Sequence, residues 1–273
     1  MTPRISIITI TYNCEATVEE TIRSVVSQGY DGLEYIIIDG GSTDKTLEIV
    51  DKYRSQIAVV VSEPDKGISD AFNKGIQRAT GEIIGIINAD DILLPDTLKR
   101  LASHYDQAVD VYSGNVLAWD DKTGNTFREH PDVRFDTMKL QYNVAHSSRF
   151  IRKSAYDRYG LFVVEMKYNM DIELLCRFYR KGAVFLYVDE DWTQFRLGGT
   201  TATPIYKKKA DYRYFVESFG GSKWDFRKLW LKAIVKYNLI RLGFLLFGED
   251  IRFKIRNNAQ IDKLVNRVNG KLF

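Results

Sequence analysis

Along roughly the first ninety residues, short apolar runs alternate with segments whose apolar positions recur at the spacing of a helix. A short continuous apolar run is typical of a strand buried on both faces, and a spacing of three and four residues is typical of an amphipathic helix. Strands are predicted at 5–10, 33–38, 57–61 and 82–87, and helices after Thr17, up to Tyr53 and over 67–78. This alternation predicts an α/β domain with a mainly parallel sheet and helices on both faces.

Residues with known positional preferences support these boundaries. Thr17 followed by Glu20 has the sequence of a capping box, and one of residues 42–44 is expected to cap the second helix. The second half of the chain is less regular. It predicts a helix from Pro95, a strand at 109–119, a hairpin turn at 121–125, helical turns at 154–159, a helix at 171–181, a strand at 185–188, a loop at 195–203 and a helical segment from 206 onward.

Length and charge divide the chain into two parts. The 273 residues suffice for one large domain with an appendage. Residues 205–273 carry 16 Lys and Arg against 6 Asp and Glu, whereas residues 1–204 carry 23 against 30. We therefore predict a catalytic domain over 1–204 and a basic helical tail over 205–273, with an anionic partner for the tail.

The cysteine content and the apolar segments bear on location. Two cysteines, Cys14 and Cys176, do not form a disulfide framework in a chain of this length, which favours a reducing compartment. The N-terminus resembles a first strand rather than a signal peptide, and every run of 18 residues contains a charge. We expect a cytoplasmic protein.

The stretch Glu63–Asp91 places an acidic pair after a predicted buried strand. Open α/β sheets bind ligands at the carboxyl ends of their strands. Asp90 and Asp91 would repel each other there unless a cation lies beside them, and carboxylate oxygens suit a divalent metal shared with a phosphate. The alternative is that one of them caps the helix near Pro95.

Two further predicted strands also end in polar residues, at 9–13 and 39–44. Asp39 can accept the N–H edge of a base, and one of Asp90 and Asp91 can bind ribose while the other binds the metal. Neither G-x-G-x-x-G after the first strand nor a P-loop motif is present, which disfavours a dinucleotide. The pattern indicates a nucleotide whose diphosphate is bound through a metal.

The segments ISIITITYN, IIIDGGSTDKT and EPDKGISDAFNKGIQRATGEIIGIINADD together resemble the family 2 glycosyltransferases of the GT-A fold. The resemblance covers about residues 1–200. It implies inverting transfer of a sugar from a nucleotide diphosphate, usually that of uridine, with Mn²⁺ or Mg²⁺. It places Asp39 on the base and Asp90 in the Asp-x-Asp position, where Asn88 replaces the first Asp. It further implies Thr9, Tyr12 and Asn13 as nucleotide-binding residues, and Lys66, Asp70 and Asn73 beside the diphosphate and donor sugar.

Inverting transfer needs a general base on the acceptor side. The segment MDIELLCR matches the family's base-bearing helix, with Asp171 at the position of the base and Met170 replacing the usual Glu. The alternatives are a capping role for Asp171 and a base role for Glu173. His146 matches a position beside the acceptor or diphosphate, or is a structural histidine, and 198–200 resembles a loop that closes over the donor.

The tail contains the apolar run Leu229–Phe247, which Lys232, Lys236 and Arg241 interrupt on one predicted helical face. Such a helix either lies on an anionic membrane or packs on the catalytic domain or a second subunit. Nucleic acid is disfavoured because the basic residues are interleaved with apolar ones. The sequence thus predicts a cytoplasmic glycosyltransferase of polysaccharide biosynthesis acting on a glycan or lipid-linked acceptor. A sugar nucleotidyltransferase, or an inactive membrane-associated scaffold, is the alternative.

Overall fold

The computed structural model describes residues 2–121, 124–133, 135, 146–197 and 203–247. The predicted alternation is confirmed through residue 86. Its elements are β1 (Ile5–Thr11), α1 (Val18–Val26), β2 (Leu33–Asp39), α2 (Thr46–Asp51), β3 (Val59–Ser62), α3 (Ile68–Arg78) and β4 (Ile83–Ile86). They are followed by β5 (Ile92–Leu93), α4 (Thr97–Ser103), β6 (Val111–Trp119), β7 (Thr126–Glu129), β8 (Arg149–Arg152), α5 (Lys153–Tyr159), α6 (Met170–Arg180), β9 (Phe185–Arg196), α7 (Lys209–Ser218) and α8 (Lys223–Phe247). Short 3-10 helices lie at Arg54–Gln56, His146–Ser148 and Ile205–Lys208.

One sheet crosses the molecule in the order β3-β2-β1-β4-β8-β6-β9-β5, with β7 paired to β6. The pairs β1–β2, β1–β4, β2–β3 and β6–β9 are parallel, while β8 runs antiparallel to both β4 and β6. The pairs β5–β9 and β6–β7 are antiparallel too, so among the described residues four strand pairs are parallel and four antiparallel, and the sheet is mixed. The parallel arrangement predicted for the first ninety residues holds for β3-β2-β1-β4, and the ends of β1, β2 and β4 that precede the predicted polar residues lie at one edge.

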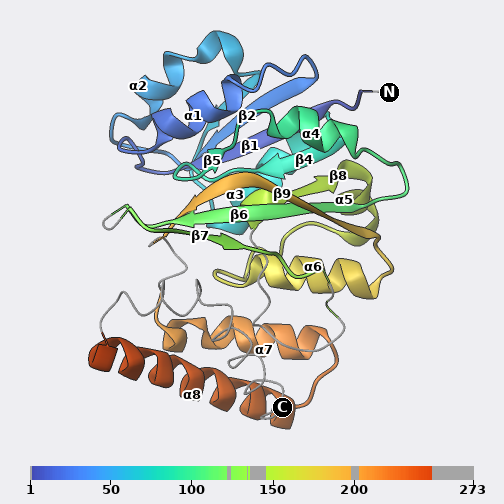
Figure 1. Ribbon diagram of the computed structural model, residues 1–273. Coiled ribbons are helices and arrows are strands. Elements are labelled where there is room, and N and C mark those ends of the chain that lie inside the picture. The colour runs from blue at the N-terminus through green and yellow to red at the C-terminus, as the bar shows by residue number, and fades with distance from the viewer. Residues whose placement is uncertain (1, 122–123, 134, 136–145, 198–202, 248–273) are drawn as a thin grey trace.

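Side chains alternate between two apolar cores, one on each face of the sheet. Ile5 and Ile7 of β1 pack in a cluster with α1 and α4, whereas Ile8 packs in a cluster with α3, α5 and α6. Figure 1 shows α1, α2 and α4 on one side of the sheet, with α6 on the other. Burial on both faces explains why these strands are uniformly apolar.

The segment after residue 204 packs against the same core as the preceding part of the chain. Tyr212 and Phe215 of α7 and Ala233 of α8 are buried in the cluster that contains Leu174 and Phe178 of α6. Figure 1 shows α7 below α6 and α8 below α7. One continuous core therefore joins the two predicted parts.

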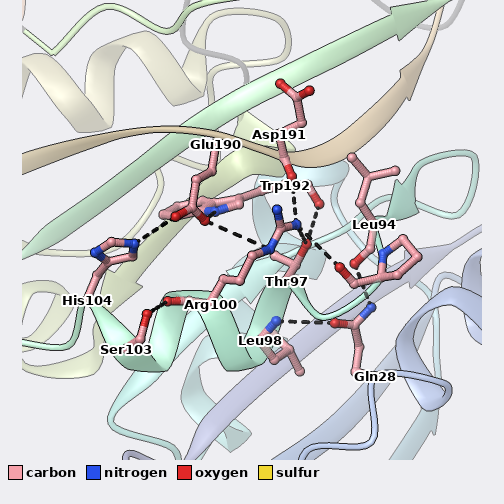
Figure 2. Close-up of polar contacts among 11 residues, drawn as sticks. Gln28, Leu94, Thr97, Leu98, Arg100, Ser103, His104, Glu190, Asp191 and Trp192 are labelled. Carbon is pink, nitrogen blue, oxygen red and sulfur yellow. Dashed lines mark hydrogen bonds and ion pairs between the residues drawn. The ribbon is translucent and has the colours of Figure 1, made fainter.

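A group of hydrogen bonds holds β9 beside β5 (Figure 2). β5 directly follows the acidic pair in the chain. Thr97 Oγ1 donates to the carbonyl of Trp192 at 3.0 Å, and Arg100 Nη2 donates to the carbonyl of Asp191 at 2.8 Å. Gln28, two residues after α1, donates to the carbonyl of Leu94 at 2.9 Å, and Leu98 N donates to Gln28 Oε1 at 3.2 Å. These bonds hold residues 92–98 between α1 and β9.

Three local predictions need correction. Thr17 precedes α1 but makes no side-chain capping hydrogen bond, so the capping box does not form. The strand predicted at 185–188 continues to Arg196 because β6 pairs with it along its length, which removes the first two residues of the loop predicted at 195–203. The helix predicted from Pro95 begins at Thr97, after Asp96 in the left-handed conformation.

Candidate active site

A pocket of about 450 Å³ opens beside the carboxyl ends of β1, β2 and β3. Tyr12, Gly40, Pro64, Asp65 and Gly67 line it. Tyr12 is 66% exposed, so its side chain is accessible at the pocket. The pocket lies at the sheet edge where the sequence predicts the nucleotide.

The carboxylate of Asp39 is fully buried and bound by the protein itself. Its Oδ1 accepts from the hydroxyls of Thr11 at 2.9 Å and Ser42 at 2.5 Å, and its Oδ2 accepts from the N–H groups of Gly41 and Ser42 and from the Ser62 hydroxyl. Burial alone would raise the pKa of Asp39, but these hydrogen bonds lower it below its ordinary value. Five donors saturate a carboxylate. Asp39 thus fastens the loop after β2, and its predicted contact with the base stays a prediction.

A second carboxylate, that of Asp65, lines the pocket, whereas Asp39 does not. Asp65 Oδ1 accepts from the N–H of Gly67 at 2.8 Å. Asp65 Oδ2 lies 2.5 Å from the place that a β-carbon on Gly40 would occupy. Gly40 therefore leaves the space that the Asp65 side chain fills at the pocket wall. The sequence reasoning missed Asp65, and the glycine directly after Asp39 was the available signal.

Two other predicted nucleotide ligands are used within the protein. Thr9 is fully buried in the sheet, and its hydroxyl accepts from Tyr35 OH at 3.1 Å, so it does not line the pocket. Asn13, in the left-handed conformation with φ 48°, accepts from Thr43 N at 2.8 Å through Oδ1. It joins the loops after β1 and β2, which fixes the neighbouring Tyr12.

The three residues predicted near the diphosphate have separate surroundings. Lys66 is exposed, and its N–H donates to Asp70 Oδ2 at 3.0 Å. Asp70 also lies 3.6 Å from Lys74 Nζ. Asn73 is buried and makes two hydrogen bonds with the backbone of Phe162, at 2.8 and 3.0 Å. Asn73 therefore holds the loop between α5 and α6, and its predicted place beside the donor sugar stays a prediction.

Three oxygens at or beside the acidic pair are buried and find no hydrogen-bond partner in the described part of the chain. They are both carboxylate oxygens of Asp91 and Oδ1 of Asn88. Burial raises the pKa of Asp91 well above its ordinary value, and the charge of Asp90 adds to this. Buried polar atoms without partners are costly unless something binds them. Asp90 is partly exposed beside them, so these oxygens fit a divalent cation. Among the described residues no three His, Cys, Asp or Glu side chains cluster as a metal site, so phosphate oxygens would have to complete the shell.

His146 joins the acidic segment to the helix that carries the predicted base. Its Nε2 lies 2.8 Å from Asn88 Nδ2, and it lines a small cavity together with Asp171, Arg149 and Phe72. Burial lowers the pKa of His146 below its ordinary value, although the charges of Asp171 and Asp90 oppose this. The structure thus brings His146, Asp171 and Asn88 together from three separate elements.

Asp171 is the second residue of α6, and its Oδ1 accepts from the N–H of Ile172 at 2.8 Å. Burial raises the pKa of Asp171 above its ordinary value, while His146 and Arg149 oppose the shift. A carboxylate with a raised pKa is a stronger base. Arg149 is buried and donates to Ser113 Oγ at 2.8 Å, which keeps its charge near Asp171.

Glu173 forms a buried ion pair with Arg177. Its Oε1 and Oε2 accept from Arg177 Nε and Nη2 at 2.8 and 3.0 Å, and Arg177 also donates to the carbonyl of Leu161. Both oxygens of Glu173 are therefore occupied, and the structure does not support the alternative of Glu173 as base or acceptor ligand. The predicted closing loop at 198–200 lies outside the described residues.

Two proteins that are similar in sequence are both described as glycosyltransferases. An uncharacterized glycosyltransferase of Haemophilus influenzae is 25% identical over 248 residues, which are 80% of this chain and 76% of that protein. A PGL/p-HBAD biosynthesis glycosyltransferase of Mycobacterium bovis is 30% identical over 179 residues, which are 63% of this chain and 66% of that protein. The chain thus spans just under two thirds of the mycobacterial relative.

Solved structures share the fold. TarS of S. aureus in complex with UDP-GlcNAc matches with a TM-score of 0.64 and 20% identity, covering 90% of this chain and 76% of that chain. Mannosyltransferase PcManGT of Pyrobaculum calidifontis, in complex with GDP-Man and Mn²⁺, matches with a TM-score of 0.62 and 20% identity, covering 84% and 68%. The fold is the GT-A fold of these glycosyltransferases. The model of glycosyl transferase family 2 matches residues 6–163, more than half of the chain, and the chain therefore belongs to glycosyl transferase family 2.

Proposed function

We propose that the protein transfers a sugar from a nucleoside diphosphate sugar to an acceptor hydroxyl, with inversion at the sugar carbon. Membership of the family supports glycosyl transfer itself. The convergence of Asp171, His146 and residues 88–91 at the end of β4 is the observation that carries the proposal, because it joins a base to the place of the leaving diphosphate. The fold relatives bound to UDP-GlcNAc and GDP-Man support a nucleotide-sugar donor.

The pocket beside β1–β3 is proposed to hold the nucleoside. Tyr12 offers a ring face to the base, and Asp65 is the carboxylate at the wall that can accept a base N–H. Uracil presents one such N–H and guanine presents two neighbouring donors, so a carboxylate suits either. We take uridine as the base, as the sequence resemblance implies, and GDP is the comparison that tests it.

Asp171 is proposed to accept the proton of the acceptor hydroxyl in a single displacement. The oxygen of the acceptor hydroxyl attacks the sugar carbon from the face opposite the diphosphate, the bond between that carbon and the diphosphate breaks, and the hydroxyl proton passes to Asp171. Burial lowers the pKa of His146, which favours its neutral form, and His146 lies near both Asp171 and Asp90, where it can orient the diphosphate or the acceptor. Asp90 and Asp91 would hold a divalent cation, Mn²⁺ or Mg²⁺, which supplies positive charge for the leaving diphosphate.

The tail is proposed to bring the enzyme to a lipid-linked or glycan acceptor of polysaccharide biosynthesis. On α8, Trp224, Leu231, Val235, Leu239 and Leu242 are exposed at the spacing of one helical face. The tail also carries a positive excess of ten charges, which suits a peripheral contact with an anionic membrane. A dimer contact through the same face is the alternative. Among the described residues no helix is long and apolar enough to cross a membrane.

The test is release of nucleoside diphosphate from a panel of nucleotide sugars, with the anomeric form of the product read by NMR. Asp171→Asn keeps the shape of the side chain but does not accept a proton at neutral pH. It should lower kcat by about 10²-fold or more while donor binding stays. Asp51→Asn, an exposed change on α2, is the control. A retained anomeric configuration, or full turnover by Asp171→Asn, would contradict the proposal.

A further inference from the structure

Asp211 lies in the segment after residue 204, yet its carboxylate is buried against the loop that precedes α6. It is the third residue of α7 and is 3% exposed. Its Oδ2 accepts from the backbone N–H of Lys167 at 3.2 Å, of Tyr168 at 2.7 Å and of Asn169 at 3.0 Å. Three consecutive N–H groups thus converge on one carboxylate oxygen.

This loop ends where the proposed base begins. Asn169 is the residue before α6, its carbonyl accepts the N–H of Glu173, and Asp171 stands two residues farther along the chain. The position of residues 167–169 therefore sets where α6 starts and where the Asp171 side chain lies. Charge-assisted hydrogen bonds of this kind are among the stronger ones in proteins.

The other side of the loop is held by α3. Asn73 bonds to both backbone groups of Phe162, and Ser69 Oγ donates to the carbonyl of Met166 at 3.0 Å. α3 fixes the first half of the loop, and Asp211 is the side chain that binds its last three N–H groups. A second contact comes from the same segment, since Lys208 Nζ lies 5.8 Å from the ring centre of Tyr168.

We propose that Asp211 is a positioning residue for the general base, so that the segment after residue 204 completes the active site. The inference rests on the proposed function of Asp171. Asp211 touches neither the pocket beside β1–β3 nor the acidic pair, because its hydrogen bonds go to the loop. Its loss should therefore affect turnover and leave donor binding in place.

Asp211→Ala removes the acceptor of three N–H groups. We expect kcat to fall by about 10²-fold, the scale of a small misplacement of a catalytic group, with the donor KM changed less than about threefold. Asp211→Asn keeps one oxygen that can accept these N–H groups, so its kcat should lie between those of Asp211→Ala and the wild type. Glu217→Ala, an exposed acidic position on the same helix, is the matched control and should match the wild type.

A double-mutant cycle with Asp171→Asn separates positioning from a general loss of structure. If Asp211 acts through Asp171, the Asp211→Ala change should cost little on the Asp171→Asn background, because the group it positions is already inactive. Hydrogen exchange of amides 167–169 should also speed up in Asp211→Ala, while that of β1 stays unchanged. All measurements use the full chain, and UDP binding stoichiometry reports the folded fraction.

The outcomes distinguish the two proposals. Full activity of Asp171→Asn would overturn the proposed base. A strong effect of Asp171→Asn with wild-type kcat in Asp211→Ala would overturn only the positioning role. Equal fold losses from Asp211→Ala on both backgrounds, or a loss explained by fewer UDP-binding molecules, would also overturn it by showing a merely structural effect.

Discussion

The buried carboxylate of Asp39 leads to a prediction that separates a structural role from a ligand-binding one. Asp39→Ala leaves the N–H groups of Gly41 and Ser42 without their acceptor. An unsatisfied donor costs about 1–3 kcal/mol, and these two groups are partly buried, so we expect a loss of about 2–4 kcal/mol in the free energy of unfolding. Asp39→Asn should cost about 1–2 kcal/mol, because one oxygen and the rotatable hydroxyls can still pair while the charge is lost.

The effect should depend on pH in a definite direction. The pKa of Asp39 is lowered in the folded protein, so its ionised form stabilises the fold at pH values above the unfolded pKa of about 3.9. This stabilisation is lost as the pH falls through the lower folded pKa. The difference in unfolding free energy between wild type and Asp39→Asn should therefore be full at pH 7 and shrink below about pH 4.

The assay combines urea unfolding with calorimetric titration of UDP and GDP. Asp65→Asn is the companion variant, since Asp65 lines the pocket and is partly exposed. It should weaken UDP binding by about tenfold, the scale of one hydrogen bond to a charged group, and change stability by less than about 0.5 kcal/mol. If Asp39→Asn leaves stability unchanged but abolishes UDP binding, Asp39 reads the base and this reasoning fails.

Two further predictions concern the metal and the tail. Asp91→Asn should raise the melting temperature of the metal-free protein, because a buried carboxyl with a raised pKa costs stability as the pH rises. Asp91→Asn and Asp90→Asn should each abolish the stabilisation that Mn²⁺ with UDP provides. Full turnover in excess chelator would contradict a metal role. The full chain should float with vesicles in proportion to their content of anionic lipid, because each basic residue near the surface contributes about 1 kcal/mol to binding. Replacing two exposed residues of α8, by Leu231→Glu with Leu239→Glu, should reduce the fraction that floats. Flotation that does not depend on lipid, together with a dimer that these changes dissociate, would favour the subunit contact.

Hydrophobic periodicity predicted the first half of the fold because burial on both faces forces uniformly apolar strands. β1 to β4 and the helices between them appear within about two residues of their predicted positions. β9 was predicted too short because Asp189, Glu190 and Asp191 are poor strand residues. β9 runs through them because β6 pairs with Tyr187 before them and with Asp191 at their end, and because α4 binds the carbonyls of Asp191 and Trp192. This is a tertiary effect that local propensity does not contain.

The structure brings some of the predicted site residues together. His146 and Asp171 line one small cavity, and His146 contacts Asn88 beside the acidic pair, whereas the ends of β1, β2 and β3 line a separate pocket. Five other predicted residues make hydrogen bonds to groups of the protein itself: Thr9, Asn13, Asp39, Asn73 and Glu173. Spacing alone does not tell a polar side chain that faces a ligand from one that faces a neighbouring loop, since both occur at strand ends.

This division has a physical reason. The loops that surround a nucleotide pocket have few apolar contacts, so they need buried hydrogen bonds to keep one conformation. Asp39 supplies these bonds to the loop after β2, Asn73 and Asp211 supply them to the loop before α6, and each of the three is buried. The acids that we propose for ligands are Asp65 and Asp90, which are partly exposed, and Asp91, whose carboxylate oxygens find no hydrogen-bond partner among the described residues. An oxygen that the protein leaves available, rather than the presence of charge, is the feature that we expect to separate acids that bind ligands from acids such as Asp39 and Asp211 that hold loops.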